Sequence, residues 1–142
     1  ELLSEDENKY HAFLILDVDC FKQINDIYGH AVGDIVLQKF GKLLKGTFRE
    51  GDILGRIGGD EFGVIMKNIQ TKDIAMKKAE ELLAKTQAYK IDELKGNNIS
   101  ISIGISTAPQ DGDCYMDLYK RADQALYQAK RSGKARVCNY FS

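Results

Sequence analysis

The chain has 142 residues, of which 44% are hydrophobic and 29% are charged, and its formal net charge at pH 7 is -1. These values are typical of one soluble globular domain with a single core. A nearly neutral chain has no bulk attraction for polyanions, so a nucleic acid polymer is not an expected partner, and phosphate binding would have to come from local geometry.

Nothing in the sequence predicts a membrane segment or a secretion signal. The longest apolar run, 12–16, is far shorter than the roughly 20 residues of a spanning helix, and the chain does not open with a basic region followed by an apolar stretch. The three cysteines, Cys20, Cys114 and Cys138, are far apart, which argues against a disulfide framework or a zinc site. We interpret them as small buried apolar residues in a reducing cytoplasm, and expect no membrane contact by this domain even if its parent protein is membrane-anchored.

The first third of the chain is expected to form one strand and two helices. Residues 5–8 are polar and predict a loop, whereas 12–19 predict a strand because an apolar run ends there in carboxylates. Residues 21–28 favour a short helix that stops at Gly29. Residues 32–48 favour a longer helix, because apolar side chains recur at three- and four-residue spacings. The apolar face of this helix consists of Val36, Leu37, Phe40, Leu44 and Phe48.

A turn and a β-hairpin are expected next. Residues 49–52 predict the turn. The segments 53–57 and 62–66 flank Gly58 and Gly59, a pair that suits a tight turn with positive φ. The acidic pair that follows these two glycines would therefore lie at or just past the tip of the hairpin.

Two further helices and a strand are expected in the second half. Thr71 is a candidate cap for a helix that runs to about Tyr89. Residues 99–106 alternate between isoleucine and Ser or Gly, which is the pattern of a half-covered strand. Residues 113–132 favour a helix with Gly133 as its C-terminal cap. The apolar stripe of this helix consists of Leu118, Ala122, Ala125, Leu126 and Ala129.

A short strand over 136–141 completes the order strand, helix, helix, hairpin, helix, strand, helix, strand. This order predicts one α/β (α+β) domain, with a mainly antiparallel central sheet flanked by helices. The sequence contains no repeats, no low-complexity segments and no internal linker, so we expect one domain over residues 1–142.

Two acidic clusters are candidate metal ligands. Asp17 and Asp19 face the same way in an extended strand, and Asp60 and Glu61 lie near the hairpin tip. If the hairpin pairs with the first strand, these carboxylates meet and repel one another unless cations lie between them. Oxygen ligands without nearby Cys or His favour Mg²⁺ or Mn²⁺ over zinc. The alternative is that these acids are solvated loop residues.

Several cationic groups are candidates for phosphate binding. The chain enters a helix through Cys20, Phe21 and Lys22, and a helix N-terminus offers free N–H groups to phosphate. Lys130 and Lys134 lie four residues apart near the end of the last helix. The alternatives are a solvated surface lysine at the first place and a favourable interaction with the helix dipole at the second.

Asn25 and Asp34 form a candidate pair for guanine. Guanine presents two adjacent donors and one acceptor on its pairing edge, so a carboxylate can accept from both donors while an amide donates and accepts. Adenine lacks this pair of donors. The structural alternatives are a helix-end residue for Asn25 and an acidic residue in the first helical turn for Asp34. His30, after Gly29, is interpreted as a turn residue rather than a catalytic base.

These motifs together resemble the GGDEF family of diguanylate cyclases, over about Leu14 to Val137. The signature Gly58-Gly59-Asp60-Glu61-Phe62 is preceded by Arg56-Ile57. The stretch 17–26 matches the family pattern D-x-D-x-F-K-x-x-N-D. Residues 122–134 match A-D-x-A-L-Y-x-A-K-x-x-G-K. Several ordered motifs at the family's spacing are more specific than an isolated GGDEF.

The resemblance implies a palm-like nucleotidyl cyclase fold and a two-metal reaction. Asp17 and Asp60 would bind two Mg²⁺ (or Mn²⁺) ions per active site, with the Val18 carbonyl contributing and Glu61 a further ligand or a neighbour of the metals. One ion would activate the 3′-hydroxyl of a GTP, and the other would neutralise the departing pyrophosphate of a second GTP. Either Asp60 or Glu61 is a candidate catalytic acceptor of the hydroxyl proton.

The resemblance also assigns the substrate-binding residues. Gly58 and Gly59 would let the backbone approach the nucleotide, Asn25 and Asp34 would read guanine, and the lysines and N–H groups named above would hold phosphates. The phosphate group comprises Cys20, Phe21, Lys22, Lys130 and Lys134. Because one site holds one GTP, the product cyclic di-GMP would form where two domains meet in a two-fold homodimer.

Arg49 and Asp52 match the family's R-x-x-D inhibitory site, which binds the product. Arg49 would clamp phosphate or guanine, and Asp52 would accept from guanine N–H groups. The family site recruits another arginine from a neighbouring helix, but the expected helix here offers only Lys77 and Lys78.

One departure from the family pattern leaves rival functions open. The family's D-x-L-T-x-L-x-N-R element is absent, so we interpret the chain as a domain truncated at its N-terminus, with a sensor domain in its parent protein. The second-ranked function is a non-catalytic receptor for cyclic di-GMP that acts through Arg49 and Asp52. Another nucleotidyl chemistry is disfavoured by Asp34, because an adenine pocket would not gain from a carboxylate. A purely structural domain would not explain the concentration of acidic, glycine and guanine-reading residues.

Overall fold

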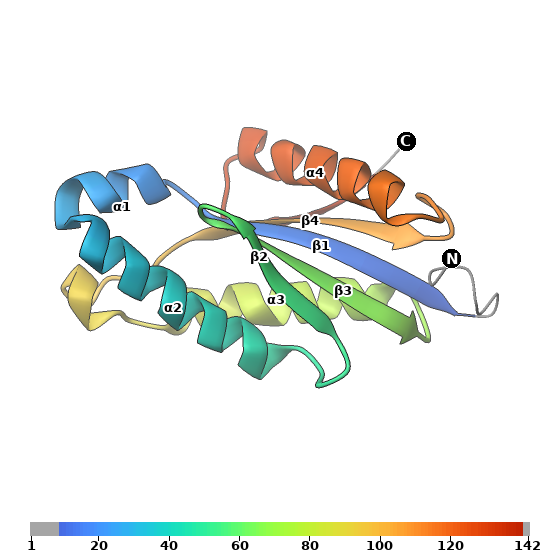
Figure 1. The fold of residues 1–142 in the computed structure, drawn as a ribbon, viewed down its shortest axis with the longest axis horizontal. Helices are drawn as coiled ribbons and strands as arrows, with labels where there is room; N and C mark the ends of the chain where they lie inside the picture. Colours follow the sequence, from blue (N-terminus) through green and yellow to red (C-terminus); the bar gives the residue numbers. More distant parts are fainter. Residues whose placement is uncertain (1–8, 141–142) are drawn as a thin grey trace.

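A five-stranded sheet forms the centre of the protein in a computed structural model that describes residues 9–140 (Figure 1). The strand order is β2-β3-β1-β4-β5. All neighbours pair antiparallel except β4 and β5, which are parallel. The elements are β1 Tyr10–Val18, α1 Phe21–Tyr28, α2 His30–Thr47, β2 Ile53–Gly58, β3 Glu61–Ile69, α3 Asp73–Ala88, the 3-10 turn η2 Asp92–Leu94, β4 Ile101–Ala108, α4 Tyr115–Arg131 and β5 Val137–Asn139.

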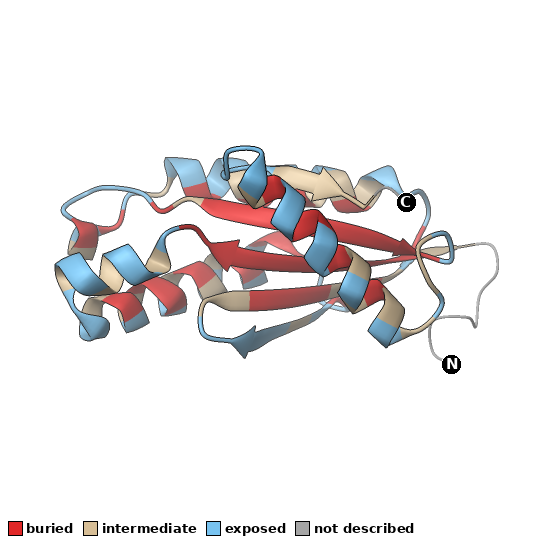
Figure 2. Cartoon of the chain, turned by 90° about the horizontal axis from the view of Figure 1, so that it is seen from above, coloured by how far each residue is buried: buried red, intermediate tan, exposed pale blue. Residues whose placement is uncertain are grey.

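Helices cover the two faces of the sheet unequally. Figure 1 shows α4 on one face and α2 and α3 on the other. The central strand β1 alternates between them: Leu14 and Leu16 pack into the core under α2 and α3, whereas Phe13 and Ile15 pack under α4. The strand is therefore buried on both faces (Figure 2). The same alternation turns Asp17 toward the face that α4 covers.

Most of the expected elements are confirmed. The short helix occupies 21–28, and the hairpin, the turn before it and the mainly antiparallel sheet are all present. The expected stripe of α4 is its buried face. Gly133, at φ +124°, follows α4, and Lys134 N donates to Ala129 O at 3.0 Å, so the helix ends in the left-handed glycine turn expected there.

The expectation that the strand over 99–106 is half covered is wrong. Every residue of β4 is buried, because its Ser and Gly positions lie directly under α4. A Cβ on Gly104 would come within 2.2 Å of Leu126 N and 2.3 Å of Ala122 O. Small side chains on this strand therefore mark a close helix contact rather than a solvated face.

Two smaller expectations are also corrected, and two lie outside the described residues. Thr71 donates to the Asp73 carboxylate but does not cap α3, whose N-cap is Lys72. None of the three cysteines is buried: Cys20 is exposed and the other two are half-buried, and all three are free thiols. The expected loop over 5–8 and the end of the last strand at Phe141 fall outside the part described. Within residues 9–140, no helix has the length and apolar character needed to cross a membrane.

Candidate active site

The two predicted acidic clusters meet at one edge of the sheet. In the antiparallel register of β1 and β3, Asp17 lies opposite Glu61. Val18 N donates to Asp60 O at 3.3 Å, which ties the hairpin turn to the end of β1. The pairing of the hairpin with the first strand, on which the metal hypothesis depended, is therefore present.

Asp17 is a buried carboxylate held beside an ammonium group. The residue is 8% exposed, and its Oδ1 lies 2.8 Å from Lys130 Nζ on α4. Burial raises the pKa of Asp17 to about 6, although the Lys130 charge opposes the rise. Burial lowers the pKa of Lys130, but the Asp17 carboxylate outweighs it and holds that pKa above its usual value.

Asp19 belongs to the framework of the site. Its carboxylate accepts hydrogen bonds from Ser100 Oγ and Ser102 Oγ, both at 2.6 Å, and from Ala135 N at 3.1 Å. Lys130 Nζ lies 3.9 Å from Asp19 Oδ1. Because its oxygens already accept three hydrogen bonds, Asp19 joins the end of β1 to β4 and to the segment after α4.

Two residues beside the acidic cluster were not identified from the sequence. Tyr119 lies with its hydroxyl 3.4 Å from Glu61 Oε1. Asp123 lines a pocket of about 400 Å³ with Asp17, Glu61 and Lys130. Burial, followed by the Asp123 charge, raises the pKa of Glu61. The spacing of four and seven residues that puts Tyr119, Asp123 and Lys130 on one helix face is the signal that could have found them.

The guanine candidates are brought together where α1 meets α2. A Cβ on Gly33, the residue before Asp34, would lie 1.9 Å from Asn25 Oδ1, so the glycine leaves room for the Asn25 side chain in its present position. Asp34 lines a second pocket with Arg56 of β2. Arg56 Nε donates to Gly59 O at 2.8 Å, bracing a turn in which Gly59 has a φ of +50°.

The phosphate candidates border the same edge. Cys20 adopts φ +56° ahead of α1, and Lys134 Nζ lies 3.4 Å from Cys20 Sγ. Lys22, in the first turn of α1, is exposed, and Phe21 is half-buried. Lys130 is paired with Asp17. The geometry thus gathers the N-terminus of α1 and the C-terminal end of α4 beside the acidic cluster.

Arg49 and Asp52 are bonded to each other. Asp52 Oδ2 accepts from Arg49 N at 2.8 Å, and Asp52 Oδ1 accepts from Arg49 Nε at 2.9 Å and Nη2 at 2.6 Å. Arg49 Nη2 also donates to Lys67 O at 3.0 Å. The Asp52 side chain is fully buried and that of Arg49 is 42% exposed, so the guanidinium is the part that faces solvent.

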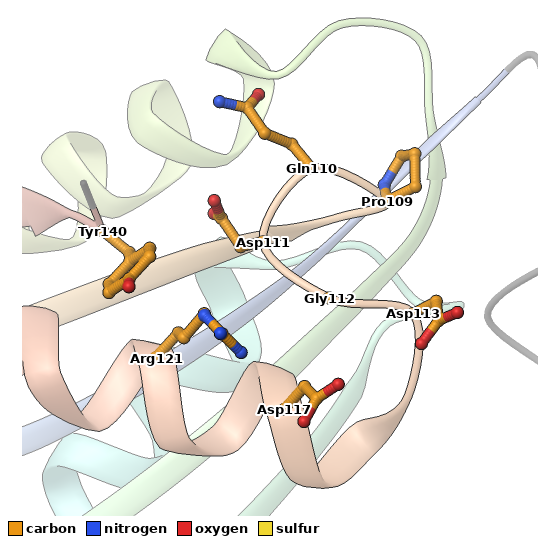
Figure 3. Close-up of a pocket in the computed structure, with 8 residues that line it drawn as sticks. All are labelled: Pro109, Gln110, Asp111, Gly112, Asp113, Asp117, Arg121 and Tyr140. Atoms are coloured by element: carbon orange, nitrogen blue, oxygen red, sulfur yellow. The ribbon is translucent and has the colours of Figure 1, made fainter. Parts of the chain in front are cut away.

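A separate pocket of about 530 Å³ lies after β4 and contains none of the predicted site residues (Figure 3). Arg121 stands over the Tyr140 ring in this pocket, 5.6 Å from its centroid. Among residues 9–140, one group of three His, Cys, Asp or Glu ligands lies within 4.8 Å of one another. It consists of Asp113, Cys114 and Asp117, and the two aspartates line this pocket.

The fold and the site together define a class: a mixed α/β domain with a palm-like sheet, of the nucleotidyl cyclase kind, whose acidic strand ends lie next to a helix N-terminus. A family model described as "Diguanylate cyclase, GGDEF domain" matches residues 1–136. The chain belongs to the GGDEF family.

Three individual proteins illustrate this similarity. The chain is 40% identical over 127 residues to diguanylate cyclase A of Treponema denticola, covering 89% of this chain and 34% of that protein. The crystal structure of the GGDEF domain of TpbB from Pseudomonas aeruginosa is 34% identical, with a TM-score of 0.91, covering 96% of this chain and 85% of that one. The GGDEF domain of DgcB from Caulobacter crescentus, in complex with c-di-GMP, is 26% identical, with a TM-score of 0.83 and coverages of 92% and 78%. The chain thus spans about a third of the length of the curated relative.

Proposed function

We propose that this domain is a diguanylate cyclase, which converts two GTP molecules into cyclic di-GMP and two pyrophosphates. The observation that carries the proposal is the register that sets Asp17 opposite Glu61, beside Lys130 and the start of α1. This arrangement gathers carboxylates for metal ions and cationic groups for a triphosphate at one edge. The name of the T. denticola relative and the c-di-GMP bound by the DgcB domain support the same activity.

The acidic cluster fits a divalent cation. Asp17 is buried opposite Glu61, and its Oδ1 lies 2.8 Å from Lys130 Nζ, so this position already favours a cation, for which a metal ion would compete with the ammonium group. Carboxylate and carbonyl oxygens are the ligands that Mg²⁺ and Mn²⁺ prefer. We assign Asp17, the Val18 carbonyl, Asp60 and Glu61 as the residues that would hold two such ions. When bound, these ions would neutralise the triphosphate and favour ionisation of the 3′-hydroxyl.

The substrate contacts follow from the neighbouring elements. Asn25 and Asp34 would hold the guanine of GTP through its pairing edge. Gly58 and Gly59 would let the hairpin backbone lie against the nucleotide, because a Cβ on either would point into open space where the nucleotide would lie. The N–H groups of Cys20 and Phe21 would bind phosphate at the start of α1, where a helix lacks internal acceptors. Lys22, Lys130 and Lys134 would add positive charge.

Each half of the reaction forms one phosphodiester bond. The 3′-oxygen of one GTP attacks the α-phosphorus of the other, the bond from that phosphorus to the β-phosphate bridging oxygen breaks, and pyrophosphate leaves. The 3′-hydroxyl loses its proton, for which Asp60 and Glu61 are the nearest proposed acceptors. The protein contributes mainly position and charge, as phosphoryl transfer requires.

Two domains must cooperate because each offers one set of GTP-binding residues. We therefore propose a two-fold homodimer in which the sites face each other. We place it in the cytoplasm, with a sensor domain in the parent protein controlling assembly.

We propose product inhibition at Arg49 and Asp52. Since both Asp52 oxygens accept from Arg49, cyclic di-GMP would meet a guanidinium held in place, and Asp52 would orient it.

The test is direct product analysis. The purified chain is incubated with GTP and Mg²⁺, and nucleotides are identified by chromatography and mass spectrometry. We expect cyclic di-GMP and pyrophosphate from the wild type and from Asp92→Asn, which neutralises an exposed acid on η2. Asp60→Asn should lower the rate by at least about a hundredfold. Binding of cyclic di-GMP without any turnover of GTP would favour the receptor function instead.

A further inference from the structure

The pocket that Asp34 lines contains a second charged residue, Arg56 of β2. The pocket measures about 460 Å³ and is lined by α2 and by the hairpin strands. The lining residues are Asp34, Leu37, Gln38, Arg56 and Phe62. We propose that Arg56 is a specificity-determining residue that donates to O6 and N7 of the guanine whose pairing edge Asp34 holds. This inference rests on the proposed use of GTP.

The pocket has the polarity of a guanine site. The apolar residues of the pocket are buried in the core, since Leu37 is 5% exposed and Phe62 is 6% exposed. The Phe62 ring packs edge-on against Phe40, with ring centroids 5.1 Å apart. The charged groups of the pocket have opposite signs, because α2 supplies the Asp34 carboxylate and β2 the Arg56 guanidinium. Guanine likewise has two N–H donors on one edge and the O6 and N7 acceptors on another. A planar base in this pocket can therefore satisfy both charged side chains at once.

Arg56 is oriented for such a contact. Arg56 is exposed, and its Nε donates to Gly59 O at 2.8 Å, which holds the guanidinium beside the glycine turn. Within the described part of the chain, its two Nη groups donate to no acceptor. An arginine that presents two N–H groups can bind O6 and N7 together, which a lysine cannot do with the same geometry. Adenine carries an amino donor in place of O6, so Arg56 would oppose it.

The test compares GTP with 7-deaza-GTP, which has C–H in place of N7 and keeps the edge assigned to Asp34. Initial rates of cyclic dinucleotide formation at subsaturating nucleotide are measured for the wild type and Arg56→Ala. We expect the wild type to prefer GTP by about tenfold and Arg56→Ala to use the two nucleotides equally. Because the ratio is taken within one variant, any general loss from disturbing the Gly59 turn cancels.

A matched control and a binding measurement complete the test. Arg121→Ala removes an arginine from the pocket after β4 and should keep the tenfold preference. An equal response of the wild type to both nucleotides, or a preference that survives in Arg56→Ala, overturns the inference. If the wild type makes no cyclic di-GMP, the proposed function fails, and calorimetric affinities for GTP and 7-deaza-GTP then judge Arg56 by the same ratio.

Discussion

Asp17 shows how a single side chain links the stability of the domain to its chemistry. A carboxylate buried at the end of β1 is costly to ionise, and its pKa of about 6 expresses that cost. Lys130 offsets part of it from 2.8 Å away. Keeping such a group ready for the proposed metal ion would come at the expense of folding stability.

We expect Asp17→Asn to stabilise the metal-free domain at pH 7.5. The folded pKa of about 6 lies above the ordinary 3.8, so the folded state holds its proton more tightly and stability falls as pH rises through this interval. The amide resembles the protonated form and avoids this loss of stability, which is on the order of 3 kcal/mol. Urea unfolding at pH 4 and pH 7.5 measures it, with Asp92→Asn as the control. A variant less stable than wild type at pH 7.5 would contradict the assignment.

Lys130→Met should expose the competition between an ammonium group and a metal ion. Without the ammonium beside Asp17, the nucleotide-free protein should bind Mn²⁺ about fivefold more tightly, while its affinity for GTP falls. Electron paramagnetic resonance of free Mn²⁺ measures the first effect without any turnover. Lys120→Met, an exposed position on α4, serves as the control. Unchanged or weaker Mn²⁺ binding in Lys130→Met would show that the ion pair and the metal do not share Asp17.

The acidic residues could be identified from the sequence, but not which of them is a candidate metal ligand and which one holds the framework of the site. Asp17 and Asp19 are equivalent in the sequence, because both are acids on the same side of one strand. Only the fold shows that the Asp19 carboxylate already accepts hydrogen bonds from Ser100, Ser102 and a backbone N–H. These partners lie more than eighty residues away along the chain, so no local pattern contains them. Which of two neighbouring acids remains available depends on such distant contacts.

At the scale of elements, the contact between α4 and β4 places the cationic end of the site. Gly104 lets the helix backbone approach the strand, and the buried face of α4 then fixes the direction in which Lys130 points. Helix positions could be predicted from apolar spacing, because periodicity is a local property. The packing of α4 over β4 could not be predicted, because alternating Ser and Gly residues are compatible either with a solvent-exposed face or with a closely packed helix.

Gly104→Ala should separate these two elements. The added Cβ would meet backbone atoms 2.2 and 2.3 Å away, which cannot move without shifting α4. We expect a loss of about 3 kcal/mol in the free energy of unfolding and reduced cyclase activity, since Lys130 moves with the helix. The matched variant Gly41→Ala meets nothing within 4 Å in α2 and should gain about 0.5–1 kcal/mol. Equal stability of Gly104→Ala and wild type would disprove the close contact.

At the scale of the whole molecule, one chain brings together one acidic cluster, one pocket lined by Asp34 and Arg56, and the start of α1. The order of elements and the mainly antiparallel sheet could be predicted, and so could the family, because several motifs occur at fixed spacing. The two-fold dimer remains a prediction, which follows from a proposed product built from two nucleotides and not from any element of the fold.

The proposed cyclase activity of a two-fold dimer is tested most directly by the initial rate of cyclic di-GMP formation per mole of chain. This rate is measured as a function of protein concentration at saturating GTP and Mg²⁺. A cyclase whose sites face each other in a weak dimer should show a rate per chain that rises in proportion to concentration and then levels off. A rate per chain that stays constant down to nanomolar protein, or no cyclic di-GMP at any concentration, would contradict the account.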